Sequence, residues 1–345
     1  VGKSTLFNAL TTSKKAQAEN FPFCTIDPNV GIVAVPDERL NKISSISRSA
    51  KTINAAITFV DIAGLVKGAS KGEGLGNKFL SHVREVDAII HLTRCFDSEK
   101  IQNVNKDVDP IRDLEIIETE ILLSDLESLQ KRLEKNNKKK LEKDELNFLE
   151  ECRKLIDNGQ KPDDLKKKFH KDLIKKSALL SLKPRIIVCN VDEKSLPDGN
   201  KYSDACKKKF LKENIIIVCA DIEDQIMSLQ AKDRKDFMHE SGIKNTGLDN
   251  LIKTGYNTLG LSTFFTSGPE ESRAWTIEKN SKAPDAAGVI HSDFKKKFIR
   301  AETVTHEDFI KYKGFNECRN AGKLRLEGKD YLVNDGDVMY FRVGN

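Results

Sequence analysis

The chain begins with VGKSTLFNAL (residues 1–10), and this stretch decides the fold class that we expect. Gly2-Lys3-Ser4-Thr5 followed by a helical run is the second half of a phosphate-binding P-loop. In such a loop the backbone N–H groups, here those of Val1 to Thr5, surround the phosphates. Lys3 reaches the β and γ phosphates, and the Ser4 hydroxyl binds Mg²⁺. Gly-Lys-Ser is a common tripeptide, so the prediction depends on further motifs along the chain.

A second motif ends the apolar run 56–60, where Asp61 is followed three residues later by Gly64. We expect the Asp61 carboxylate to hold Mg²⁺, usually through water, and the Gly64 N–H to sense the γ-phosphate. Thr25 lies in the polar connection before the next strand and is expected to close over Mg²⁺ as a switch residue. The sequence thus predicts Lys3, Asp61 and Gly64 in catalysis, and Ser4, Thr25 and Asp61 around the metal.

A third motif, Asn190-Val191-Asp192-Glu193, follows the apolar run 185–189. GTPases place Asn-Lys-x-Asp here, with the Asp carboxylate accepting two N–H bonds from guanine. The longer Glu193 side chain does not fit that edge, and Val191 replaces the base-stacking lysine, so this motif favours ATP over GTP. Cys219, which ends the run 215–219, and Ala220, which follows it, complete the predicted nucleotide-binding set.

Composition narrows the class of protein. The net charge is +5, with lysines in short clusters that are either a solvated surface or an attraction for a polyanion such as ribosomal RNA. The seven cysteines are odd in number and never spaced CxxC, which argues against a disulfide framework or a zinc site and favours a reducing cytosol. No run approaches the roughly 20 apolar residues of a membrane helix, so we expect no membrane contact.

The order of the patterns predicts three domains. Continuous apolar runs in two blocks, 1–110 and 184–262, predict an α/β domain with a parallel sheet between helices. Leucines and isoleucines at steps of three and four over 111–183 predict an inserted antiparallel, coiled-coil-like helical hairpin. The hairpin either docks on a partner or is a structural arm. Residues 263–345 predict a small α+β domain.

Four segments resemble the Obg-like ATPases, the YchF family: residues 21–29, 61–80, 273–277 and 287–294. The resemblance implies a P-loop domain, a coiled-coil insertion and a C-terminal TGS domain with a β-grasp fold. It also implies Mg²⁺-dependent hydrolysis of ATP to ADP and phosphate, association with ribosomes and a cytoplasmic location. The family has a short strand and the first half of the P-loop before the position of Val1, and we expect these residues to have been omitted here.

The resemblance also assigns site residues. Asn190, Val191 and Glu193 would surround the adenine. Leu65 stands where Ras-like GTPases have a water-orienting Gln, and Asn103 stands where family members often have a His. The leading hypothesis is therefore a slow ATPase switch. The alternatives are a nucleotide-gated binding scaffold with little hydrolysis, which Leu65 and Asn103 favour, and a GTPase, against which Glu193 argues.

Overall fold

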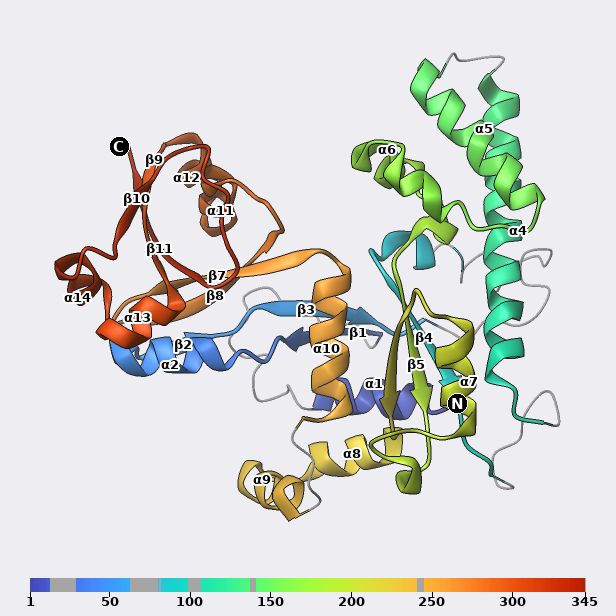
Figure 1. The fold of residues 1–345 in the computed structure, drawn as a ribbon, viewed down its shortest axis with the longest axis horizontal. Coiled ribbons are helices and arrows are strands. Elements are labelled where there is room, and N and C mark those ends of the chain that lie inside the picture. Colours follow the sequence, from blue (N-terminus) through green and yellow to red (C-terminus); the bar gives the residue numbers. More distant parts are fainter. Residues whose placement is uncertain are drawn as a thin grey trace. The chain divides into compact units, whose positions relative to one another are not determined.

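The structure, a computed structural model, describes residues 1–12, 29–62, 80, 82–98, 107–136, 141–240 and 245–344. The chain divides into two compact units, one formed by Val1–Ala9 and Val60–Leu229 and the other by Leu10–Phe59 and Gln230–Asn345 (Figure 1). Within the described ranges, no helix is both long enough and apolar enough to cross a membrane.

A parallel sheet forms the centre of the first unit. Its strands are β4 (Ile89–Arg94), β5 (Arg185–Asn190) and β6 (Asn214–Val218), in the order β4-β5-β6. β5 and β6 correspond to the apolar runs 185–189 and 215–219, and a continuous apolar run suits a strand buried on both faces. The first unit also contains most of α1 (Lys3–Thr12), together with α7 (Lys201–Lys209), α8 (Ala220–Ser228) and the short η4 (Glu193–Ser195).

The stretch between β4 and β5 is helical, as its periodicity predicted. It contains α4 (Pro110–Asn136), α5 (Lys143–Asp157), η2 (Asp163–Lys167), α6 (Lys171–Ser177) and η3 (Leu180–Leu182). In Figure 1, α4 and α5 lie side by side, and buried side chains from both helices, including Leu129, Phe148 and Cys152, form one apolar cluster. The buried Asp125 carboxylate accepts hydrogen bonds from the N–H groups of Leu180 at 2.9 Å and Ser181 at 2.8 Å, which anchors η3 to α4.

The second unit is built around a six-stranded sheet of order β10-β9-β11-β7-β8-β2. Its C-terminal strands are β7 (Leu261–Ser267), β8 (Glu271–Glu278), β9 (Phe298–Thr305), β10 (Arg325–Glu327) and β11 (Asp337–Val343). The helices α11 (Ala283–Ile290), α12 (Ser292–Lys296), α13 (His306–Tyr312) and α14 (Phe315–Asn320) connect them. The core contains Phe264, Met339 and Phe341 together with three alanines of α11, whose small side chains allow the helix to pack closely.

The sixth strand comes from far away in the sequence, and the sequence did not predict it. β2 (Lys51–Ile53) pairs in parallel with β8, and α2 (Glu38–Ser47) precedes it. Arg39 of α2 forms an ion pair with Asp335 at 2.6 Å, and its guanidinium lies 5.2 Å from the centre of the Phe265 ring. Residues 38–53 thus belong to the same compact unit as the C-terminal sheet. The unit also holds the two-stranded sheet of β1 (Val30–Ala34) and β3 (Ala56–Val60), and the helices α9 (Ala231–Glu240) and α10 (Gly247–Thr258).

Candidate nucleotide-binding site

Gly2 occupies a backbone position that only glycine fits. Its φ is +88°, in the region that L side chains rarely adopt. A Cβ atom there would lie 2.4 Å from the Asn190 Nδ2 atom and 3.3 Å from the Ala220 Cβ atom. The Gly2 carbonyl accepts the N–H of Leu6 at 2.9 Å, so α1 begins directly from this residue. The close approach of Asn190 and the left-handed backbone therefore explain the glycine before Lys3.

Asn190, the last residue of β5, holds this loop in place. Its Nδ2 atom donates to the Val1 carbonyl at 2.9 Å, and its Oδ1 atom accepts the Ala220 N–H at 2.9 Å. The Asn190 backbone carbonyl also accepts the Cys95 N–H at 2.8 Å. The side chain is only 4% exposed. Asn190 thus joins the P-loop at Val1, the start of α8 and the residue that follows β4.

Two of the three predicted catalytic residues meet. The Lys3 ammonium forms an ion pair with the carboxylate of Asp61, just beyond the end of β3, and both side chains are partly exposed. Ser4 is exposed in the first turn of α1. The remaining predicted residues, Gly64, Thr25, Leu65 and Asn103, lie outside the described part of the chain.

The residues predicted around the base differ in their surroundings. Val191 is 2% exposed and packs in an apolar cluster, and its N–H donates to the Val218 carbonyl at 2.8 Å. Glu193 is exposed at the start of η4. Cys219 is buried and precedes α8, and the Ala220 N–H is already bonded to Asn190. Their contact with a base stays a prediction.

The Asp192 carboxylate makes a local hydrogen bond, in which its Oδ1 atom accepts the Ser195 hydroxyl at 2.5 Å.

Two positioning residues were missed by sequence reasoning. Asn200, at the N-cap of α7, donates from Nδ2 to the Cys95 carbonyl at 2.7 Å. The buried Arg94 donates to the carbonyls of Phe96 at 3.0 Å and Ser98 at 3.1 Å. Both shape the turn after β4. The arginine at the end of this strand was the available signal for this role.

Three features define a P-loop nucleoside triphosphatase domain: Gly2 in the loop, the pairing of Lys3 with Asp61, and the hydrogen bonds of Asn190 to Val1 and Ala220. We call these bonds of Asn190 the clasp. Comparisons with known families agree with this class. A family model described as "50S ribosome-binding GTPase" matches residues 1–124. The YchF C-terminal family model, described as "Protein of unknown function (DUF933)", matches residues 261–344.

Similarity extends along nearly the whole chain. The "Ribosome-binding ATPase YchF" of Bacillus subtilis (strain 168) is 47% identical over 352 residues, which cover 99% of this chain and 96% of that protein. The protein of the same description from Escherichia coli O157:H7 is 46% identical over 350 residues, with the same coverage. The solved structure of the Schizosaccharomyces pombe YchF GTPase matches with a TM-score of 0.88 at 38% identity, covering 99% of this chain and 95% of that one. This chain belongs to the YchF family, as its motifs predicted.

Proposed function

We propose that the chain binds and hydrolyses ATP to ADP and phosphate and uses this cycle as a switch on the ribosome. The observation that carries the proposal is the pairing of Lys3 with Asp61 beside a loop that Asn190 holds in place. Relatives at 46% and 47% identity that are described as ribosome-binding ATPases support the same function. A ribosomal partner would place the protein in the cytoplasm.

Lys3 is the residue that would stabilise charge on the transferring phosphoryl group. In the structure its ammonium bonds to Asp61. The β and γ phosphates would compete for this ammonium, and the Asp61 carboxylate would then be available as a metal ligand. The backbone N–H groups at the start of α1 would face the phosphates, because the first turn of a helix leaves these donors without helical partners.

The residues present suit Mg²⁺. The Ser4 hydroxyl and the Asp61 carboxylate are both accessible, and both are the oxygen ligands that this ion prefers. We infer that Ser4, Thr25 and Asp61 hold the metal and that the Gly64 N–H senses the γ-phosphate. Bound Mg²⁺ neutralises charge on the phosphate oxygens.

ATP is the proposed nucleotide because of the environment of Val191 and Glu193. GTPases have a lysine at the position of Val191. Here that side chain is buried among apolar groups, where an ammonium would be costly without a partner. Glu193 is exposed and one methylene longer than the guanine-reading aspartate. We infer that Asn190 supports the loop rather than reading the base, and that Val191 and Glu193 border the adenine.

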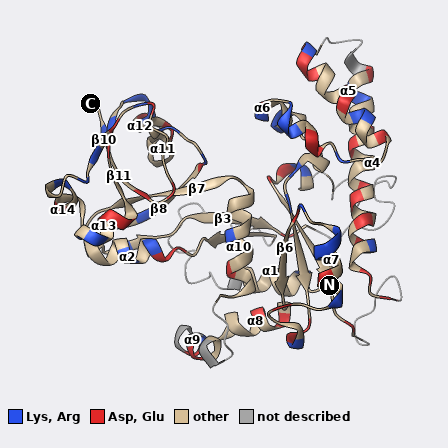
Figure 2. Cartoon of the chain, in the orientation of Figure 1, with Lys and Arg blue, Asp and Glu red and all other residues tan. Residues whose placement is uncertain are grey.

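The proposed ribosome-binding surface includes a basic patch on η2 and α6, where Figure 2 shows α6 rich in lysine. Its exposed members are Lys167, Lys168, Lys171, Lys175 and Lys176. Lys168 pairs with Glu151 and Lys176 with Glu145, whereas the other three have no ion pair within the described residues. Unpaired ammonium groups are the ones that gain most from phosphate contacts, since they lose no existing partner.

Around this chemistry we propose the domain arrangement of the family. Residues 1–110 and 184–262 would form the P-loop domain, 111–183 an inserted coiled-coil hairpin, and 263–345 a TGS domain of the β-grasp fold, to whose sheet β2 of the first segment adds one strand. The packing of α4 against α5 supports the second assignment, and the mixed sheet packed against α11 supports the third.

Single-turnover phosphate release with ATP or GTP and Mg²⁺, with and without ribosomes, tests the proposed activity. Lys3→Ala should lower the rate with ATP about a hundredfold, the cost of removing one transition-state donor. Lys311→Ala, an exposed lysine of α13, is the control and should leave the rate unchanged. Equal rates for wild type and Lys3→Ala, or faster turnover of GTP than of ATP, would contradict the proposal.

Ribosome association is tested separately by cosedimentation at two salt concentrations. The triple change of Lys167, Lys171 and Lys175 to Ala should weaken binding and reduce its salt dependence. Changing Lys207, Lys208 and Lys209 to Ala removes the same charge from α7, where two of the three are already paired with acidic residues, and should have a smaller effect. If the α7 variant binds more weakly than the α6 variant, the assigned surface is wrong.

A further inference from the structure

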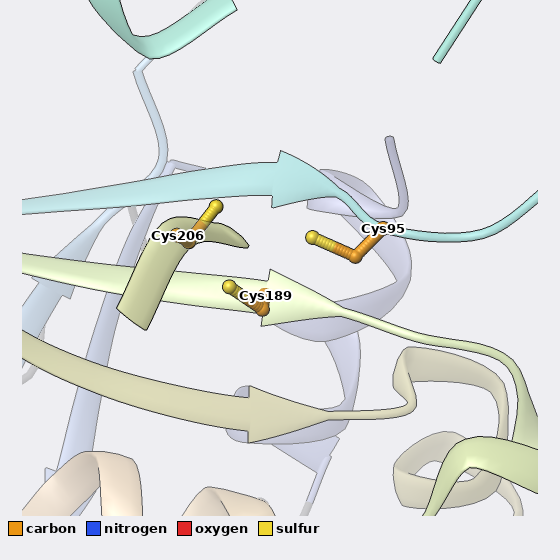
Figure 3. Close-up of side chains that lie close together, drawn as sticks. All are labelled: Cys95, Cys189 and Cys206. Carbon is orange, nitrogen blue, oxygen red and sulfur yellow. The ribbon is translucent and has the colours of Figure 1, made fainter. Parts of the chain in front are cut away.

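Three cysteine side chains that are far apart in the sequence meet beside the central sheet of the first unit. Cys95 directly follows β4, Cys189 lies in β5 and Cys206 in α7. All three residues are fully buried, and their sulfur atoms all lie within 4.8 Å of one another. Figure 3 shows the three sulfurs turned toward one another from these three elements.

The separation of the sulfurs is close to what one shared ion needs. Metal–sulfur bonds of about 2.3 Å place two sulfurs on one ion roughly 4 Å apart when three ligands surround it in a plane. Adjustments of well under 1 Å are therefore enough to bring three sulfurs, each within 4.8 Å of the others, onto one ion. Cysteines also pack in cores as small apolar side chains, and that role alone is the competing explanation.

The surroundings indicate which kind of ion fits. The cluster is lined by apolar side chains, among them Leu114, Ile187 and Val191. Within the described residues, the group contains three candidate ligands and no fourth. Structural zinc sites almost always have four ligands, so three sulfurs are one too few. Soft thiolate ligands also select Cu(I), for which three sulfurs suffice.

The net charge of the buried pocket also favours Cu(I). A monovalent ion that replaces one thiol proton leaves the net charge of the pocket unchanged. This matters because an uncompensated charge is expensive in an apolar interior. The ion keeps its oxidation state, one thiol proton leaves to solvent, and no oxidant or reductant takes part.

We propose that Cys95, Cys189 and Cys206 form a buried site for one Cu(I) ion held by three sulfurs. The site adjoins the clasp that holds the P-loop. Cys189 directly precedes Asn190, and the Cys95 N–H donates to the Asn190 carbonyl at 2.8 Å. An ion at this point would join β4, β5 and α7 at the strand ends from which the nucleotide loops begin.

The experiment titrates the reduced full chain with Cu(I), delivered anaerobically as its coloured bicinchoninate complex. The wild type should withdraw one equivalent of copper, and X-ray absorption should find three sulfurs at about 2.3 Å. Changing any one of the three cysteines to Ala should weaken binding about a hundredfold, because one of three ligands is lost. Cu(I) should also raise the Tm of the wild type by several degrees, since it binds the folded state.

Two other buried cysteines provide matched controls. Cys152→Ala removes a fully buried thiol from the α4–α5 cluster of the same unit, and Cys318→Ala removes one from the second unit. Both variants should bind copper like the wild type. Circular dichroism identifies any variant that fails to fold, and the X-ray absorption of the wild type does not depend on the variants.

Several outcomes would overturn the proposal. The first is a wild type that takes no copper from bicinchoninate, which would leave the cluster as core packing only. The second is a triple Ala variant that still binds one equivalent, which would place the copper elsewhere. The third is fewer than three sulfurs in the X-ray absorption. Stronger binding of Zn(II) than of Cu(I) would overturn the choice of ion.

Discussion

The replacement of Asn190 by Ala tests the central feature of the candidate site, the clasp between the P-loop and α8. The change removes the donor to the Val1 carbonyl and the acceptor of the Ala220 N–H, each at 2.9 Å. Because Asn190 is only 4% exposed, water does not easily replace these bonds. A buried polar group left without a partner costs about 1–3 kcal/mol, so two of them lower the free energy of unfolding by about 2–6 kcal/mol.

Urea unfolding followed by circular dichroism measures this loss as a lower midpoint at unchanged m-value. Calorimetric titration with ATP and GTP adds a second readout. If Asn190 supports the loop, the affinities for both nucleotides should fall by a similar factor. If Asn190 instead contacts the base, the ratio of the two affinities should change.

The control is Asn158→Ala. Asn158 is exposed in the same unit and donates one hydrogen bond, to the Lys154 carbonyl at 2.9 Å. Its loss should change the free energy of unfolding by about 0.5 kcal/mol or less. An Asn190→Ala protein as stable as the Asn158→Ala control would refute the clasp. So would a change confined to nucleotide selectivity.

Three further predictions concern buried or constrained groups. Gly2→Ala should weaken ATP binding at least about tenfold and destabilise the fold by about 1–2 kcal/mol, measured by calorimetry and urea unfolding, because its φ is +88° and its Cβ would approach Asn190. Asp125→Ala should lower the free energy of unfolding by about 2 kcal/mol or more in urea, since two buried N–H groups lose their acceptor. Burial, with the positive charges of Arg185 and Lys161 nearby, lowers the pKa of His91 to about 3. The unfolded chain therefore binds a proton below pH 6.5 that the folded protein binds only near pH 3. Between these two pH values, the free energy of unfolding of the wild type should fall as the pH is lowered. Its slope should be about 1.4 kcal/mol per pH unit steeper than that of His91→Leu. Urea unfolding at a series of pH values measures both slopes.

Each of these has a matched comparison. Gly159→Ala has a similar φ of +69° with nothing within 4 Å of the added Cβ, so it isolates backbone strain from the clash at Gly2. If both glycine variants lose the same stability, the contact with Asn190 is irrelevant. Asp125→Asn keeps one acceptor oxygen and should be milder than Ala; the reverse order would refute the anchoring of η3. Parallel pH profiles for wild type and His91→Leu would contradict the assignment to His91.

The sequence by itself determined the local elements of this protein. The apolar runs at 185–189 and 215–219 became β5 and β6, and α4 begins at Pro110, next to the predicted start of the helical insertion at 111. Gly2-Lys3-Ser4-Thr5 does begin a helix, and Asp61 does follow a strand. Each of these predictions depends only on the pattern of apolar and polar residues within one short segment. No tertiary information was therefore needed to make it. Lys3 and Asp61 were both predicted in catalysis from their motifs, and the structure shows that their side chains meet.

Only the tertiary structure decided which distant residues meet. Asn190 was predicted near the base, but its amide bonds to Val1 and Ala220 depend on how β5 lies beside two other segments. The three buried cysteines have no motif spacing, and they converge because β4 and β5 are neighbours in register while α7 covers them. β2 pairs with β8, although more than 200 residues separate them in the chain, as the register Lys51↔Glu271 shows. Which strands pair and which side chains are buried together depends on the fold of the whole chain. Local sequence patterns predict single helices and strands, but they do not specify which distant segments pair.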